Sequence, residues 1–360
     1  MSSIKQKLFL LAGLLTGTKA WAGPLDVLVD TTGRCNLNCV GCLTHSPLLK
    51  GSTGGNRTTT PADIPFSTFT RLCDELSEYG ECLVTLAGEG EPLLHPQLIE
   101  MLQYAKSCHL KTRINTNGTL ITHQKAKELI NSGLDELVFS LWAIDSAHAE
   151  EVYPGRGKAT LGTQMKSLEI LREAKQIVAS STPRIILYHP LNHQTMGSLG
   201  EIMKLASEYD CDSVHFSPLR TRQGRVSALA PDSEQIKTLK AFCKTGNDKR
   251  GKHNLNDVIL AYKLGERVWE HAPCYIGWFG FYLDRSGDIR PCKMCKMSLG
   301  TLKKTPLKSI WNGQEMRAFR VKSGTRKGLS ELLDSCDCEY CCRAITNYEI
   351  HHKTRWFMKT

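Results

Sequence analysis

The sequence predicts an α/β fold: a partial TIM-type (βα)6 barrel, followed by a small cysteine-rich α+β domain. From residue 25 to about residue 220, short β-rich runs alternate with longer segments of helical periodicity, the order typical of parallel βα units. After about residue 225 the alternation breaks and cysteines gather near the end of the chain. A length of 360 residues accommodates such a barrel with one smaller unit.

Each expected strand is a short apolar run, and each helix shows apolar residues three or four positions apart. The first helix contains Phe66, Phe69, Leu72, Cys73, Leu76 and Tyr79 at that spacing and ends at Gly80. The later helices are expected near residues 96–108, 125–131, 165–175 and 198–209. The six strands are expected at residues 25–30, 82–87, 111–115, 136–141, 184–191 and 213–219.

The domain boundaries follow from these elements. We expect a lead-in segment over residues 1–24, the barrel over 25–225 and the cysteine-rich domain over 226–360. In the last domain, the runs 275–283 and 288–290 flank Gly287, which predicts a hairpin whose turn uses glycine at positive φ.

The first residues resemble a secretory signal, because Lys5 and Lys7 precede an apolar run and Ala20-Trp21-Ala22 resembles a cleavage site. The run from residue 8 to 15 is short, however, and an oxidising compartment would threaten metal-binding thiolates. We therefore expect an amphipathic lead-in helix in a cytoplasmic protein, with a targeting segment as the alternative. The segment is too short to span a bilayer.

The net charge of +10 is spread along the chain without blocks of like charge. A solvated surface explains this charge better than a dedicated anion site does. No zinc-finger spacing or aromatic RNA-binding motif is present, so a nucleic-acid partner is not expected.

Three of the 15 cysteines follow the first strand closely, with the spacing C-x3-C-x2-C at Cys35, Cys39 and Cys42. This position is the carboxyl end of a strand, where α/β barrels place their active sites. Three thiolates can bind three irons of a four-iron cluster and leave one iron open. A structural zinc site with His45 as the fourth ligand, or simply buried thiols, is the alternative.

These residues resemble the radical S-adenosylmethionine (SAM) superfamily, whose cluster motif has this spacing in a partial (βα)6 barrel. The resemblance covers about residues 25–220 and implies a [4Fe-4S] cluster on Cys35, Cys39 and Cys42, with SAM at the open iron. The family's Gly-Glu-Pro turn after the second strand matches residues 88–92, although Glu89 stands where many members have glycine. By resemblance, the residues that bind SAM are Gly88, Gly90, Glu91, Pro92, Asn117 and Ser140.

The chain departs from the family pattern at Gly41. Family members commonly have an aromatic residue just before the third cysteine, near the adenine of the cofactor. The equivalent contact must here come from Leu43 or from a side chain elsewhere in the chain.

The C-terminal cysteines resemble the SPASM and twitch extensions that hold auxiliary iron-sulfur clusters. The resemblance covers about residues 270–345 and implies one auxiliary [4Fe-4S] cluster on Cys274, Cys292, Cys338 and Cys341, with Cys295 and Cys336 as alternative ligands. A structural zinc is the alternative, because C-x2-C pairs are also zinc knuckles. The cysteines expected in the core are Cys73, Cys82, Cys108, Cys211 and Cys243.

The resemblance implies an enzyme that reductively cleaves SAM and uses the 5′-deoxyadenosyl radical to abstract hydrogen from a substrate. The substrate is expected to be a peptide or a small metabolite such as a sugar, and the electron donor a flavodoxin or ferredoxin. Two alternatives remain open at this stage: a zinc-stabilised binding protein without radical chemistry, and an iron-sulfur protein that only relays electrons.

Overall fold

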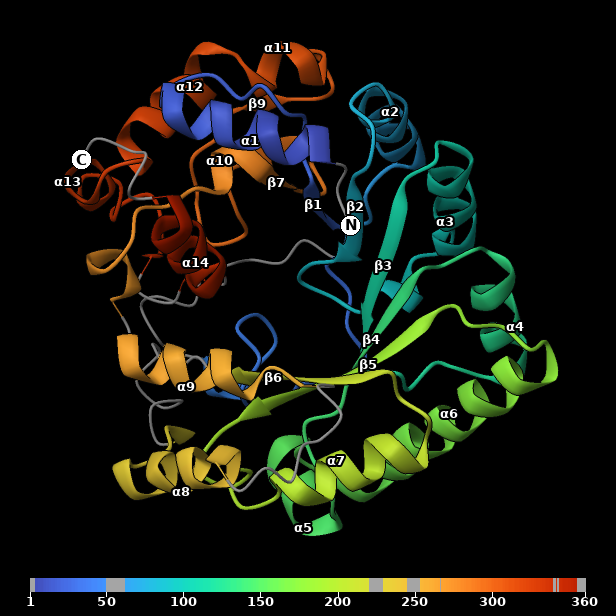
Figure 1. Cartoon of the computed structure of the whole chain (residues 1–360). Coiled ribbons are helices and arrows are strands. Elements are labelled where there is room, and N and C mark those ends of the chain that lie inside the picture. Colours follow the sequence, from blue (N-terminus) through green and yellow to red (C-terminus); the bar gives the residue numbers. More distant parts are fainter. Residues whose placement is uncertain are drawn as a thin grey trace.

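In the computed structural model, residues 4–49, 62–219, 229–244, 253–265, 267–338, 341 and 343–354 are described. One nine-stranded sheet forms the centre, in the order β6-β5-β4-β3-β2-β1-β7-β8-β9. Figure 1 shows the sheet curving as an open barrel, with α2, α3, α4, α6 and α7 around its outside. The predicted α/β partial barrel is therefore confirmed.

The first six strands are parallel and pair in chain order. Their apolar residues form much of the core, and Val27, Val29, Val84 and Leu86 are fully buried. Each strand end lies within one residue of the prediction. The strands are β1 (Asp26–Asp30), β2 (Leu83–Ala87), β3 (Lys111–Thr116), β4 (Glu136–Ser140), β5 (Arg184–Leu191) and β6 (Ser213–Pro218).

The barrel helices bury the stripes that the sequence predicted; in α2, for example, Phe69, Leu72 and Leu76 have no exposed surface. The short helix α5 (Ser146–Val152) was not predicted. Asp145 caps it by accepting hydrogen bonds from the amides of Ala147 and His148. The other helices around the barrel are α2 (Phe66–Ser77), α3 (Leu98–Ser107), α4 (His123–Asn131), α6 (Gly157–Ile177) and α7 (Leu199–Glu208).

The cysteine-rich region continues the barrel sheet, because β7 (Gly280–Leu283) pairs in parallel with β1. β8 (Asp288–Arg290) then returns antiparallel around the turn at Gly287, so the predicted hairpin is present. The prediction of a strand over residues 275–283 was partly wrong, since residues 276–279 form the helix α10 (Ile276–Phe279). An apolar run this short does not distinguish helix from strand by periodicity.

The remaining described elements of this region do not all lie near the hairpin, because the first two of them pack beside β6. They are α8 (Ser233–Lys244), α9 (Leu255–Leu264), η4 (Val268–Glu270), β9 (Gly300–Thr301), α11 (Leu307–Trp311), α12 (Gln314–Ser323), α13 (Arg326–Ser330) and α14 (Ala344–Thr354).

The expected N-terminal helix is present as α1 (Ile4–Thr16). It packs on the C-terminal region, where the indole N–H of Trp278 donates to the Gly13 carbonyl at 2.9 Å. Among the described residues, no helix combines the length and apolar character that crossing a bilayer requires.

Three of the five cysteines expected in the core are buried: Cys73, Cys82 and Cys211. Cys108 and Cys243 are half-buried and pack against the core, so the prediction holds for them only in part. Cys108 is the residue at the C-terminal cap of α3, where the helix end meets solvent.

Candidate active site

The cysteine motif lies in the loop that leaves the carboxyl end of β1, and all three of its thiols are half-buried. The amide of Cys42 donates to the carbonyl of Cys39 at 3.0 Å, which folds the second half of the motif into a turn. The amides of Thr44 and His45 point at the sulfur of Cys42 from 3.4 and 3.2 Å. Such amide donors stabilise negative charge on a cluster-bound thiolate.

Burial raises the pKa of Cys35 to about 11 and raises that of Cys39 further. Thiols of this kind lose their protons when a metal cation binds them. Within the described ranges, no three Cys, His, Asp or Glu side chains converge on one point as ligands of a single ion do. A four-iron cluster binds each thiolate through a different iron, so its ligands need no common point.

The turn at residues 88–92 lies directly against the start of the cysteine loop. Gly88 has a φ of +124°, and a Cβ there would lie 1.9 Å from Asp30 Oδ1. A Cβ on Gly90 would lie 2.1 Å from the Arg34 carbonyl oxygen. Glycine is therefore required at both positions for the backbone of this turn to approach the cysteine loop.

Glu91 is buried and fastens this turn to the end of β3. Its carboxylate accepts hydrogen bonds from the Thr116 hydroxyl at 2.6 Å, the Asn117 amide at 2.7 Å and the Leu93 amide at 3.1 Å. Burial raises its pKa, and these three donors oppose the rise. The Glu91 carboxylate thus positions the turn, which leaves the backbone around Gly90 to contact a cofactor. Pro92, also buried, begins the 3-10 turn η2 (Pro92–Leu94).

Asn117 and Ser140 end the next two strands at the same edge of the sheet. The side-chain amide of Asn117 donates to the side-chain oxygen of Asn36 at 2.9 Å, so it ties the β3 end to the cysteine loop. Gln164 of α6, fully buried, donates to the carbonyls of Asn117 and Ser140 at 2.9 and 3.1 Å. Gln164 was not predicted from the sequence, where its signal is a polar residue on the buried stripe of α6.

Trp142 fills the place beside Gly41 where the sequence analysis expected an aromatic contact. A Cβ built on Gly41 would lie 2.7 Å from Cζ3 of the Trp142 ring and 2.9 Å from Cδ1 of Leu219. Trp142 itself follows β4 and is half-buried. The absence of a side chain at residue 41 therefore leaves space for the ring of Trp142, which comes from the loop after β4.

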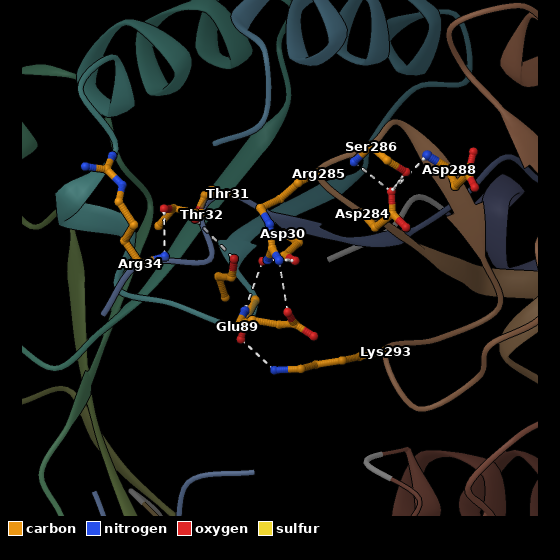
Figure 2. A network of polar contacts seen from close by, with 12 residues as sticks. Asp30, Thr31, Thr32, Arg34, Glu89, Asp284, Arg285, Ser286, Asp288 and Lys293 are labelled. Carbon is orange, nitrogen blue, oxygen red and sulfur yellow. Dashed lines mark hydrogen bonds and ion pairs between the residues drawn. The ribbon is translucent and has the colours of Figure 1, made fainter. Parts of the chain in front are cut away.

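A polar network joins the barrel to the hairpin of the C-terminal region (Figure 2). Arg285 forms ion pairs with Asp30 and, at 3.0 Å, with Glu89, while the Glu89 amide donates to Asp30 at 2.9 Å. Lys293 donates to the Gly88 carbonyl at 2.6 Å. Burial raises the pKa of Asp30, against the opposing effect of Arg285 and Lys293. The network holds the hairpin against the Gly88–Pro92 turn.

The four cysteines predicted to hold an auxiliary cluster line one largely apolar pocket, together with Trp269 and Asn347. Cys295 and Cys336 line it as well and form a disulfide with each other. The Trp269 indole N–H is buried without a hydrogen-bond acceptor among the described residues, and Asn347 points its amide at the Cys341 sulfur from 3.8 Å. Four sulfurs and two donors in an apolar pocket fit an iron-sulfur cluster.

The fold and these two cysteine sites define an iron-sulfur enzyme with an α/β barrel. Residues 29–217 match the radical SAM superfamily, and residues 274–342 match an iron-sulfur cluster-binding domain, SPASM. The chain therefore belongs to the radical SAM superfamily and carries a C-terminal SPASM domain. Its cofactors are SAM, a [4Fe-4S] cluster and auxiliary iron-sulfur. These matches favour a radical SAM enzyme over the zinc-protein and electron-relay alternatives.

Among similar proteins, the PqqA peptide cyclase of Gluconobacter oxydans is 24% identical, with 87% of this chain and 83% of that protein covered. The AdoMet-dependent heme synthase of Methanosarcina barkeri is 25% identical, with coverages of 88% and 89%. Two solved structures share the fold at 17% identity. SuiB of Streptococcus suis, bound to its precursor peptide SuiA, has a TM-score of 0.64 and coverages of 88% and 71%. The structure of anSMEcpe with bound AdoMet has a TM-score of 0.63 and coverages of 92% and 98%.

Proposed function

We propose that this enzyme cleaves SAM at a cluster on Cys35, Cys39 and Cys42 and modifies a peptide by hydrogen abstraction. One observation carries the proposal: the three cysteines and the Gly88–Pro92 turn meet at the carboxyl ends of β1 and β2. When bound at these residues, a reduced cluster and SAM would supply the radical chemistry that removes the hydrogen atom.

The protein residues bind and orient the cofactor. The Gly90 backbone faces the cysteine loop and offers peptide groups to the methionine part of SAM, because no side chain stands between them. Ser140 lies at the end of β4 and offers a polar contact to the ribose. Asn117, just after β3, would reach the ribose by exchanging its hydrogen bond to Asn36. Trp142, against Gly41, offers an aromatic ring to the adenine. Such fixed contacts place the reacting carbon near the substrate and exclude water.

Cys274, Cys292, Cys338 and Cys341 hold the auxiliary cluster in this proposal. The pocket's apolar lining and the Trp269 N–H support it. The cluster would accept the electron left on the substrate radical or bind the substrate. In this proposal a flavodoxin or ferredoxin supplies the electron for SAM cleavage. The cluster-binding thiolates support a reducing, cytoplasmic location.

A peptide is favoured over a small metabolite because two relatives are named for peptides: PqqA peptide cyclase, and SuiB bound to the precursor peptide SuiA. A small metabolite is the second candidate substrate, because another relative is named as a heme synthase.

The first experiment measures 5′-deoxyadenosine after anaerobic reconstitution and addition of SAM and dithionite. The triple variant Cys35→Ala/Cys39→Ala/Cys42→Ala is expected to lose the product, whereas Cys108→Ala, a half-buried cysteine away from both sites, keeps it. Product formation by the triple variant at the wild-type rate would refute the assignment. Incubation with a candidate precursor peptide, followed by mass spectrometry, tests the substrate class.

A further inference from the structure

The N-terminal helix α1 is apolar on two sides, only one of which the protein covers. Its inner side buries Gly13 and Leu14 and packs against Trp278. On the outer side, Ile4, Leu8 and Leu15 are 78%, 61% and 50% exposed. At 3.6 residues per turn, these three side chains form one stripe along the helix.

Lysines border this outer stripe on both edges. Each residue turns the helix by about 100°, so Lys5 and Lys7 project about 80° to either side of the stripe's centre. The Lys5 ammonium lies 5.7 Å from the ring centre of Phe9, which is 40% exposed. Beyond the helix, Lys19 lies 4.4 Å from the ring centre of Trp21, which is 51% exposed.

The C-terminal segment that the residues after α1 contact is also strongly basic. The segment after α1 is fastened to it, since Asn312 accepts from the Ala20 amide at 3.0 Å and Arg320 donates to the Thr18 carbonyl at 3.3 Å. Helix α1 contacts α10, which in turn contacts α12. Residues 303–327 contain one acidic residue, Glu315. The exposed basic residues there are Lys303, Lys304, Lys308, Arg317, Lys322, Arg326 and Lys327.

We propose that the outer face of α1 docks onto an anionic lipid surface. Ile4, Leu8 and Leu15 enter the boundary between headgroups and acyl chains, and Lys5 and Lys7 reach the phosphates from both edges. The helix of 13 residues is about 20 Å long, shorter than the hydrocarbon core, and so lies in the membrane plane.

The charge distribution selects this partner over a second copy of the chain. Two copies that paired through this stripe would bring the lysines of both helices together, and like charges at an interface oppose association. An anionic bilayer supplies both the apolar layer and the complementary charge. The docking is independent of the proposed catalytic function, since α1 contributes no residue to either cysteine site.

The test is co-sedimentation of the full-length reconstituted protein with phosphatidylcholine vesicles, with and without phosphatidylglycerol. We expect binding only to the anionic vesicles, weakened by salt. Leu8→Ser/Leu15→Ser and Lys5→Glu/Lys7→Glu should each reduce it by about tenfold or more. Ile177→Ser/Val178→Ser, which changes exposed apolar residues at the end of α6, is the matched control and should bind like the wild type.

Unchanged binding by the α1 variants, or equal binding to neutral vesicles, would overturn the proposal. So would a wild-type dimer in sedimentation equilibrium that Leu8→Ser/Leu15→Ser dissociates, because the face would then serve a second copy. Retention on a polyglutamate matrix without vesicle binding would assign the surface to an acidic protein instead.

Discussion

The ammonium group of Lys293 lies 2.6 Å from the carbonyl oxygen of Gly88 and thereby links the two candidate cluster sites. Lys293 directly follows Cys292, which lines the auxiliary pocket, and Gly88 begins the turn that faces the cysteine loop. One side chain and one hydrogen bond therefore connect the auxiliary pocket to the turn at the proposed SAM site. The positions of the two sites are therefore coupled through the hairpin.

Replacing Lys293 should affect SAM binding although the residue lies outside the barrel. In Lys293→Met the Gly88 carbonyl loses a charged donor, a contact worth about 1.5–3 kcal/mol, so the KM for SAM should rise by about tenfold or more while kcat changes less. Steady-state assays of 5′-deoxyadenosine measure both constants. Lys296→Met, an exposed neighbour, is the control. Identical kinetics for the two variants would show that the contact does not position the turn.

The ion pair between Arg285 and Asp30 should stabilise the join between the barrel and the hairpin. Asp30 is 2% exposed, and Arg285→Leu leaves its carboxylate buried without its partner. The free energy of unfolding should fall by about 3–5 kcal/mol in urea titrations. The double variant Arg285→Leu/Asp30→Asn should recover part of this loss. A double variant that loses the sum of the single effects would show that the pair contributes no coupling.

The aromatic ring of Trp142 should be replaceable by an aromatic side chain at residue 41. Trp142→Ala should weaken binding of S-adenosylhomocysteine by about tenfold, because stacking of a base on an aromatic ring is worth about 1–3 kcal/mol. Gly41→Phe alone should lower the melting temperature, since its side chain meets the Trp142 ring.

The combined variant Gly41→Phe/Trp142→Ala returns one aromatic ring to the same place. Titration calorimetry should show affinity recovering toward the wild type, with exposed Trp21→Ala as the control. Wild-type affinity in Trp142→Ala alone would remove Trp142 from the cofactor site.

His189 should make stability depend on pH. Its Nδ1 lies 2.6 Å from the Leu141 carbonyl oxygen, and complete burial lowers its pKa from 6.5 to about 4. Because this pKa is lowered by folding, the stabilising contribution of neutral His189 to the free energy of unfolding is complete above pH 6.5. It is lost as the pH falls toward 4. Between about pH 7.5 and pH 5 the wild type should lose about 2 kcal/mol more than His189→Asn in urea titrations. Parallel pH profiles would contradict this account.

The sequence predicted the barrel strands closely because short runs rich in β-branched and aromatic residues between helical segments, such as residues 184–191, have few other interpretations. It did not predict that β7 would extend the sheet beside β1, since pairing between strands about 250 residues apart leaves no local pattern. Helix α5 was missed because it is short and mostly polar, and its main local signal is the Asp145 cap.

The residues of the candidate site that belong to a sequence motif could be predicted. Those that the fold brings in from distant parts of the chain could not. The spacing of Cys35, Cys39 and Cys42 is visible in the sequence, whereas the role of Gln164 depends on α6 crossing the ends of β3 and β4. Similarly, Gly41 was recognised as a departure, but only the folded chain shows that Trp142 packs against it.

The most direct test of the central claim is iron and sulfide content after anaerobic reconstitution, measured for the wild type and for variants of each site. We predict roughly eight irons in the wild type and roughly four in both Cys35→Ala/Cys39→Ala/Cys42→Ala and Cys274→Ala/Cys338→Ala/Cys341→Ala, with 5′-deoxyadenosine lost in the first variant. Zinc instead of iron in the wild type, or an iron content that neither variant lowers, would contradict the assignment of both cluster sites.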